Sequence, residues 1–289
     1  MTGRGGGCIF LLSDYGQVDE FVGVLRAVAA RLAPGAPVVD LTHDVAAFDV
    51  RAGAQALWRA AAHLGPGVVV AVVDPGVGGA RRPVALGLGA GAGDGDGDGV
   101  TGPSALVGPD NGLLMEAAGA LGGVRQAVEL RRDRSVSSTT FDGRDVFVPA
   151  ACALWRGEPL ASLGDGLAPS DLVTLDPLLV RAGGGRLEAE VTWVDRFGNV
   201  QLAATTDHLC QAGLSGPASL QLALPGDATR GLHRVGSFAE LGDLPGEGGS
   251  EPVGLLVDAN GRLSLVCDRR RAATVLAVRV GDTVVVRST

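Results

Sequence analysis

Polar and charged residues follow several apolar runs of this sequence, at the positions where strands would end. Ser13-Asp14-Tyr15-Gly16 follows one run, and Asp40-Leu41-Thr42-His43-Asp44 ends another. Asp74-Pro75-Gly76 ends a third, with Arg81 seven residues further on, and Asp142 lies in a motif that opens a helical pattern. Ligands of open α/β sheets bind outside the carboxyl ends of the strands. Several carboxylates at that edge therefore predict a ligand-binding site, most simply that of an enzyme.

The elements that must position these residues occupy the first 180 residues, where short apolar runs alternate with helical patterns. Val68–Val73 is an unbroken apolar run, which indicates a strand covered on both faces. The other expected strands are Cys8–Ser13, Val38–Leu41, Val84–Leu88, Ala105–Gly108 and Ala127–Leu130, and the expected helices are Asp19–Leu32, Val50–Leu64 and Asp145–Arg156. This alternation predicts an α/β fold with a mixed, mostly parallel sheet flanked by helices. The glycine-rich segment Gly87–Gly102 is expected to be an insertion between two strands.

The composition changes near residue 183, where strand-like alternation separated by Gly, Pro and Asp turns begins. Leu187–Asp195, Ser219–Leu224, Leu263–Val266 and Thr283–Val286 carry this pattern. It predicts a smaller all-β, barrel-like domain. The expected domains are therefore residues 1–182 and residues 183–289.

The composition excludes several classes of function. The 24 basic residues are all arginine, so no lysine is present to form a Schiff base or a Walker A phosphate loop. The net charge of −8 argues against a nucleic-acid groove. No apolar run is long enough for a membrane helix, and the four scattered cysteines suit reduced thiols in the cytoplasm. The four histidines do not form a metal-binding pattern, so we expect no metal and no cofactor.

A family resemblance rests on six motifs that occur in order along nearly the whole chain. They are SDYGQVDEFVGVLRA, DLTHDVAAFDVRAGA, VVDPGVGGARRPVAL, GPDNGLL, STTFDGRDVFVPAA and VDRFGN. In these the chain resembles the S-adenosylmethionine (SAM) hydroxide adenosyltransferases, adenosine-forming hydrolases related to the fluorinase and chlorinase enzymes. The resemblance implies an N-terminal α/β domain, a C-terminal β-barrel, and a homotrimer with substrate sites at subunit interfaces. It also implies hydrolysis of SAM to adenosine and methionine by attack of water at the ribose C5′.

The resemblance assigns roles to individual residues. Asp74 and Arg81 match the catalytic aspartate and arginine: a carboxylate can accept the proton of water, and a guanidinium stabilises the developing hydroxide. Asp14 matches the acceptor of the ribose hydroxyls. The remaining matches to substrate-binding positions are Asp19, Phe48, Phe141, Asp195 and Asn199.

Two positions depart from the family pattern. Asp142 stands where the catalytic triad of the family has histidine, so two acids, Asp74 and Asp142, would surround one water and share a proton. Near residues 259–262 the family often has serine for the methionine carboxylate, and Asn260 is the best substitute here. Three alternatives remain open: a catalytically weak or silent SAM- or adenosine-binding protein, a halide-using adenosyltransferase, and a divalent-metal hydrolase using Asp14, Asp44, Asp49 and Asp74.

Overall fold

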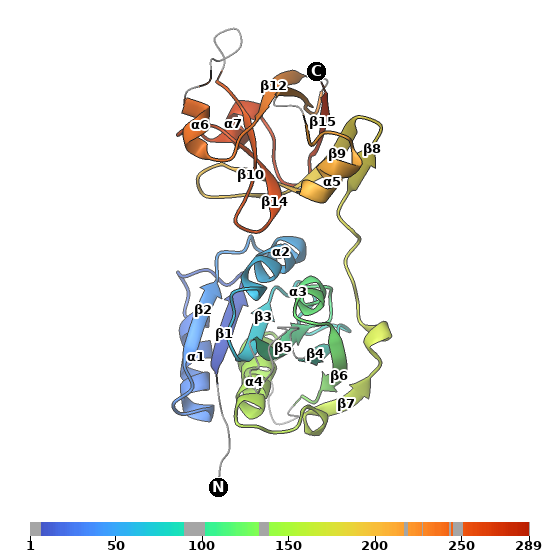
Figure 1. Ribbon diagram of the computed structural model, residues 1–289. Helices are drawn as coiled ribbons and strands as arrows, with labels where there is room; N and C mark the ends of the chain where they lie inside the picture. The colour runs from blue at the N-terminus through green and yellow to red at the C-terminus, as the bar shows by residue number, and fades with distance from the viewer. Residues whose placement is uncertain are drawn as a thin grey trace. The chain divides into compact units, whose positions relative to one another are not determined.

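The computed structural model describes residues 7–89, 102–132, 139–216, 219–226, 228–242, 244 and 251–288. The chain divides into two compact units, residues 1–175 and 176–289 (Figure 1). The sequence-based boundary at residue 183 falls at the end of β8 (Val180–Gly183), a strand that pairs with the sheet of the second unit.

A seven-stranded sheet forms the centre of the first unit, in the order β2-β1-β3-β5-β4-β6-β7. Neighbours from β2 to β5 are parallel, whereas β4 is antiparallel to β5 and to β6, and β7 is antiparallel to β6. The strands are β1 (Cys8–Ser13), β2 (Val38–Thr42), β3 (Gly67–Val72), β4 (Pro83–Leu88), β5 (Pro103–Pro109), β6 (Val124–Leu130) and β7 (Gly164–Leu167). The predicted mixed, mostly parallel sheet is confirmed. Most of the segment Gly87–Gly102, between β4 and β5, lies outside the described residues.

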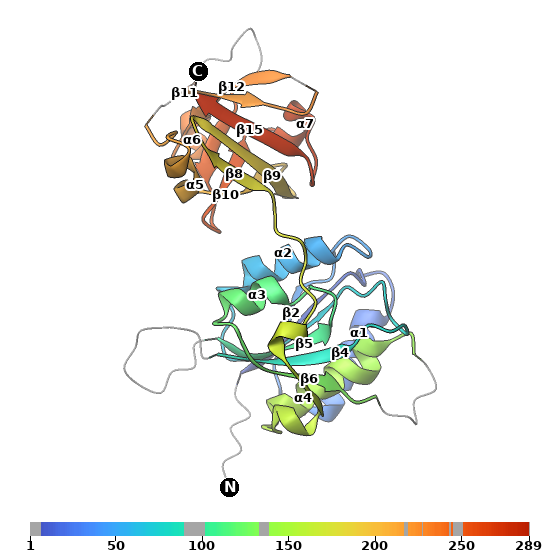
Figure 2. The ribbon, with the colours of Figure 1, turned by 90° about the vertical axis from the view of Figure 1, so that its right-hand side faces the viewer.

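Helices cover both faces of this sheet (Figure 2). Ile9, Leu11 and Val70 face the layer of α1 and α4, while Phe10 and Leu12 face the layer of α2 and α3. The helices are α1 (Phe21–Leu32), α2 (Val50–Ala61), α3 (Met115–Ala120) and α4 (Val148–Trp155), with short helical turns at Leu160–Ser162 and Pro169–Asp171. Because successive strand residues point to opposite faces, an unbroken apolar strand is what such a three-layer core requires.

The helix expected over Asp145–Arg156 differs from the observed one at its start. Residues Gly143–Phe147 form a π-helical turn that continues into α4. Asp142 precedes this turn with helical backbone angles. Wide turns of this kind are frequent at functional sites.

The second unit is a closed barrel, which confirms the predicted barrel-like domain. Seven strands close in the order β9-β10-β14-β13-β12-β11-β15, with β15 returning to β9, and β8 pairs with β9 in addition. The strands are β9 (Arg186–Val194), β10 (Val200–Thr205), β11 (Ser219–Ala223), β12 (Thr229–Arg234), β13 (Gly254–Val257), β14 (Arg262–Val266) and β15 (Thr283–Ser288). Short helices lie between them: α5 (Thr206–Gln211), α6 (Phe238–Gly242) and α7 (Ala272–Leu276). Alternate buried residues such as Leu220, Leu222, Leu263 and Leu265 fill the interior.

One pair of barrel strands is parallel. β12 and β13 run in the same direction, whereas the other neighbouring pairs in the described sheet are antiparallel. Parallel neighbours need a crossover connection that returns the chain to the starting end. The described residues between these two strands include α6 (Phe238–Gly242).

Candidate active site

The carboxyl ends of β1 and β3 bring two of the predicted site residues to one edge of the sheet. The two strands are parallel neighbours in which Ser13 pairs with Val72 (Figure 1). Asp14 follows β1 directly, and Asp74 follows β3 by two residues. The GPDNG motif supports this edge, because the Asn111 side chain donates to the Val73 carbonyl over 2.9 Å.

Asp74 and Arg81 form a side-on ion pair. Arg81 Nε donates to Asp74 Oδ1 over 2.9 Å, and Arg81 Nη2 donates to Asp74 Oδ2. Their side chains are only 5% and 9% exposed, so solvent screens this pair weakly. Burial acts to lower the pKa of Arg81, but hydrogen bonds to Asp74 and Asp142 outweigh burial and raise it. Arg81 is therefore a permanent cation, and its guanidinium also lies 5.3 Å from the ring centre of buried Phe147.

Asp142 joins the same cluster, and so does Arg132, which the sequence interpretation missed. Arg81 Nη2 donates to Asp142 Oδ2 over 2.5 Å. Arg132 binds both carboxylate oxygens of Asp142, through Nη1 to Oδ1 and through Nη2 to Oδ2 over 2.8 Å. Each of the two carboxylates thus has a guanidinium partner, and Arg81 contacts both. The two carboxylates are thus joined through Arg81, and the sharing of a proton between Asp74 and Asp142 stays a prediction.

One donor of this cluster has no partner. Arg81 Nη1 is buried and makes no hydrogen bond within the described part of the chain. An unsatisfied buried N–H is costly and is found mainly where a water or ligand completes it. Arg81 Nη1 is therefore a donor that the described chain leaves unused, although Arg81 is not among the residues that line the cavity beside Asp74 and Asp142.

A cavity of about 290 Å³ adjoins the two acids. Asp14, Asp19 and Phe48 line it together with Asp74 and Asp142. Asp14 Oδ2 accepts the Phe48 backbone N–H over 2.9 Å. Phe48 has a positive φ of 68° and is 71% exposed. Phe141 does not line this cavity: its ring packs edge-on against Tyr15 at 5.7 Å and Phe21 at 5.2 Å between centroids.

Tyr15 also lines the cavity, and the sequence analysis assigned it no role. Burial, followed by the charges of Asp14, Asp74 and Asp142, raises its pKa far above the ordinary value, so the phenol keeps its proton. A Cβ at position 143 would lie 2.7 Å from the Tyr15 hydroxyl oxygen, and only glycine allows this close approach.

A Ser-His-Asp arrangement, in which Ser13 and His43 are buried and Asp40 is partly exposed, connects the loops after β1 and β2. Ser13 Oγ lies 2.7 Å from His43 Nδ1 and accepts the Tyr15 backbone N–H, and His43 Nε2 lies 3.1 Å from Asp40. Burial alone would raise the pKa of Asp40, but Arg26 and His43 lower it. Ser13 and His43 are 0% and 1% exposed, so this serine positions a loop and cannot reach a substrate.

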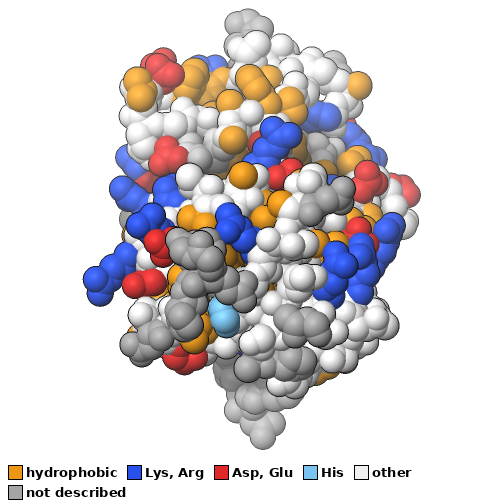
Figure 3. Space-filling model, turned by 90° about the horizontal axis from the view of Figure 1, so that it is seen from above, with side chains coloured by type: hydrophobic (Ala, Val, Ile, Leu, Met, Phe, Trp, Pro, Cys, Tyr) orange, Lys and Arg blue, Asp and Glu red, His pale blue; other side chains and the backbone are white. Residues whose placement is uncertain are grey.

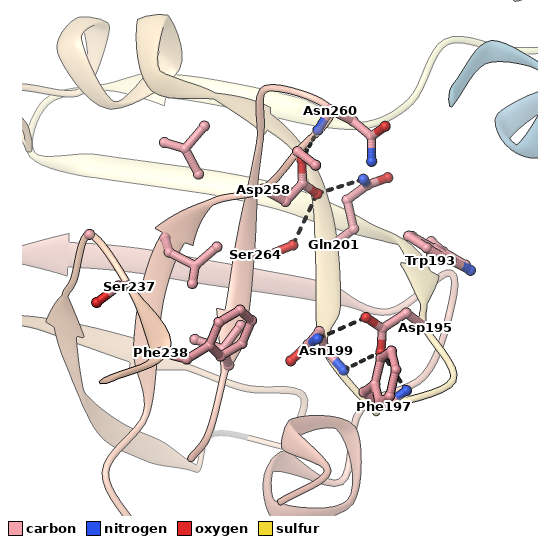
Figure 4. A pocket seen from close by; sticks show the side chains of 15 residues that line it. Trp193, Asp195, Phe197, Asn199, Gln201, Ser237, Phe238, Asp258, Asn260 and Ser264 are labelled. Atoms are coloured by element: carbon pink, nitrogen blue, oxygen red, sulfur yellow. Dashed lines mark hydrogen bonds between the residues drawn. The ribbon is translucent and has the colours of Figure 1, made fainter. Parts of the chain in front are cut away.

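The second unit has its own, larger pocket of about 570 Å³ (Figure 4). Asp195, Asn199 and Asn260 line it beside Phe197 and Phe238, which are 74% and 49% exposed. Exposed aromatic faces with nearby amides suit a planar heterocycle. On the face seen in Figure 3, arginine side chains are spread, with acidic side chains among them.

The acceptors of this pocket are partly used by its own turns. Asp195 accepts the backbone N–H groups of Phe197 and Asn199 and the Asn199 side-chain amide over 2.8 to 2.9 Å. The Asn199 backbone carbonyl accepts the Asp195 N–H over 3.0 Å, and these bonds do not engage the side-chain oxygen Oδ1 of Asn199. Asp258, which the sequence analysis did not single out, binds Gln201 Nε2 over 2.7 Å and the Asn260 backbone N–H over 2.8 Å.

A metal centre has no structural basis in the residues described. No group of three or more His, Cys, Asp or Glu side chains there is arranged to hold an ion. Asp49, a member of the hypothetical metal set, instead caps α2 by accepting the Ala52 N–H over 2.8 Å. Among the described helices, none has the length and apolar character needed to cross a membrane.

Comparison with known proteins identifies the family. The SAM hydroxide adenosyltransferase N-terminal domain matches residues 9–164, and the corresponding C-terminal domain matches residues 189–285. The (R)-S-adenosyl-L-methionine hydrolase of Salinispora tropica is 43% identical over 277 residues, which cover 95% of each chain. A fluorinase of an Actinoplanes species is 28% identical over 302 residues, covering 99% of each. An uncharacterized conserved protein from Thermotoga maritima has a crystal structure that matches with a TM-score of 0.83 at 28% identity, covering 96% of this chain and 99% of that one. The chain therefore belongs to the SAM hydroxide adenosyltransferase family.

Proposed function

We propose that this family member hydrolyses SAM to adenosine and L-methionine, with water as the nucleophile. The observation that carries the proposal is the Asp74–Arg81 pair, whose buried Arg81 Nη1 has no partner in the described chain. The relatives named (R)-S-adenosyl-L-methionine hydrolase specify one configuration at sulfur. We propose the same (R) substrate for this chain.

The reaction forms a bond between the water oxygen and C5′ while the C5′–S bond breaks. The electron pair of that bond goes to sulfur, so methionine leaves as a neutral thioether and needs no general acid. The water proton passes to Asp74 and then to solvent. Arg81 Nη1 stabilises the hydroxide character that develops on the oxygen, a role in which a fixed donor is most effective.

The other site residues hold the substrate. Asp14, a carboxylate in the cavity wall, suits the ribose diol as a hydrogen-bond acceptor. Asp19, exposed in the same wall, suits the methionine ammonium. Asn199, Asn260 and the aromatic rings of the second-unit pocket suit the adenine and the amino-acid end of the substrate. The sulfonium is a cation, and the carboxylates of the cavity favour it.

We also propose a homotrimer with sites at subunit interfaces, and a cytoplasmic location. The resemblance implies the first, and light scattering after size exclusion measures it. The four free cysteines support the second, because such thiols persist in a reducing compartment.

The decisive experiment incubates the purified protein with SAM in ¹⁸O-water. Adenosine and methionine in equal amounts, with ¹⁸O at the 5′ oxygen of adenosine, establish attack at C5′. Unlabelled adenosine refutes this mechanism, and SAM binding without adenosine release identifies a silent binding protein. Added fluoride or chloride tests the halide alternative through a 5′-halogenated product, and a chelator tests the metal alternative.

A further inference from the structure

Arg132 makes two hydrogen bonds to Asp142, and the proposed mechanism gives this contact no role. It lies two residues after β6 and holds Asp142 with both terminal nitrogens. The Asp142 side chain is 3% exposed, whereas that of Arg132 is 34% exposed. An acid that lies almost completely inside the protein is thus neutralised by a cation that reaches it from the surface.

The pairing balances the charges around the reaction centre. Asp74 and Asp142 are two carboxylates and Arg81 and Arg132 are two guanidiniums, so the formal charges of the four groups cancel. Arg81 shares its Nη2 between both acids. Because Arg132 occupies both oxygens of Asp142, Arg81 does not have to neutralise Asp142 alone.

We propose that Arg132 is a positioning residue for the reaction, which acts through Asp142 to keep Arg81 aligned with Asp74 in a cluster without net charge. This inference rests on the proposed function. Hydroxide character develops beside Arg81, and a surplus negative charge in a weakly screened site opposes it. The sulfonium substrate has the opposite sign, so the same surplus charge does not weaken its binding.

Removing Arg132 is therefore expected to lower kcat without raising the KM for SAM, whereas a general loss of structure would impair both. In Arg132→Gln the four positions carry one net negative charge, and Arg81 is drawn towards Asp142. We expect kcat to fall by about 10- to 100-fold, as small misplacements of reacting groups do. The KM for SAM is expected to stay unchanged or to decrease.

A second substitution restores the charge balance. In Arg132→Gln/Asp142→Asn the Asp74–Arg81 pair is left as a neutral unit, so this double variant should turn over faster than Arg132→Gln alone. Arg132→Lys keeps the charge without the two-point contact and should lie between the wild type and Arg132→Gln. Arg131→Gln is the matched control, since the neighbouring Arg131 pairs with Asp165 at the surface and should leave kcat unchanged.

Binding provides a readout that does not depend on turnover. The preference for SAM over the uncharged thioether S-adenosylhomocysteine, measured by calorimetry, should increase in Arg132→Gln and return to the wild-type value in the double variant. The inference is wrong if Arg132→Gln has the wild-type kcat and the wild-type preference, or if the double variant is as slow as Arg132→Gln. A wild-type protein that forms no adenosine refutes the proposed function instead, and the binding preference then still tests whether Arg132 balances the charge of the cluster.

Discussion

Replacement of Arg81 by lysine keeps the charge of the cluster and removes its geometry. Arg81 makes three hydrogen bonds to two buried carboxylates and directs a fourth donor, Nη1, at no partner among the described residues. A lysine ammonium is a compact point charge that cannot span both acids and also reach the place of Nη1. Arg81→Lys therefore tests whether the direction of the donor, and not its charge, supports the reaction.

The expected loss follows from the donor that disappears. A fixed donor to a developing oxyanion contributes about 2.7–4 kcal/mol, equivalent to about 100- to 1000-fold in kcat. We expect kcat for adenosine release to fall within that range, while the KM for SAM changes much less. Stability should fall as well, since hydrogen bonds to charged groups contribute about 1.5–3 kcal/mol each.

The assay is single-turnover release of adenosine, with urea unfolding measured in parallel. Arg82→Lys is the matched control: Arg82 is the next residue and pairs with nearly buried Asp110, but contacts neither Asp74 nor Asp142 in any bond described. It should lose stability and keep kcat. If kcat of Arg81→Lys stays within about threefold of the wild-type value, the direction of the donor does not contribute the expected rate increase, and the reasoning is refuted.

Three further predictions address binding, thiol chemistry and the barrel turn. Asp14→Asn should raise the KM for SAM about 10-fold with a smaller effect on kcat, because it weakens an ionised acceptor of the ribose diol; an unchanged affinity for adenosine would contradict this. Cys152 and Cys267, whose burial raises their pKa to about 11, should resist iodoacetamide at pH 8 in the folded protein, while exposed Cys210 reacts; mass spectrometry showing equal labelling would refute the buried positions. Gly198→Ala should lower the free energy of unfolding by about 2 kcal/mol or more, because φ is +89° and the new Cβ would lie 2.5 Å from the nearest atom; an unchanged urea midpoint would count against the turn as described.

Most strands of the first unit were predictable from their apolar runs, whereas β7, with the sequence GDGL, was not expected. β1 and β3 lie within one residue of their expected ends, since burial on both faces leaves no polar residue inside the run. The helix α3 was not expected: it spans only six residues, too few for a helical period to be recognised. Ala117 and Ala118 are buried in the core cluster that also contains Leu57 of α2, so packing against the rest of the unit stabilises this short helix.

The barrel was predictable as a class but not strand by strand. β12 has the sequence TRGLHR, in which Leu232 is the buried residue, so no alternation marks it as a strand. Its ladder partners β11 and β13 hold it in place. Pairing between distant segments is a tertiary effect, and local patterns carry little information about it.

The candidate site was predictable where residues follow strand ends and not where they meet across the chain. Asp14, Asp74 and Arg81 stand in motifs with their own local signal. Arg132 is ten residues from Asp142 in sequence, and nothing near it marks a site. One indirect signal did exist. Two neighbouring buried acids need a second cation beside Arg81, and because the chain has no lysine, that cation had to be another arginine.

The parallel pair of strands in the barrel places part of the second-unit pocket on a connection between strands, while residues such as Gln201 and Ser264 line the pocket from the strands themselves. Gly236, Ser237 and Phe238 belong to the crossover between β12 and β13 and also form part of the pocket wall. The exposed side chains of this connection can vary while the seven strands stay in register, whereas its buried Leu241 packs against Leu256 and Val266. Substitutions at the exposed positions of that loop therefore offer a way to change the ligand preference of the pocket while the strands of the barrel stay the same.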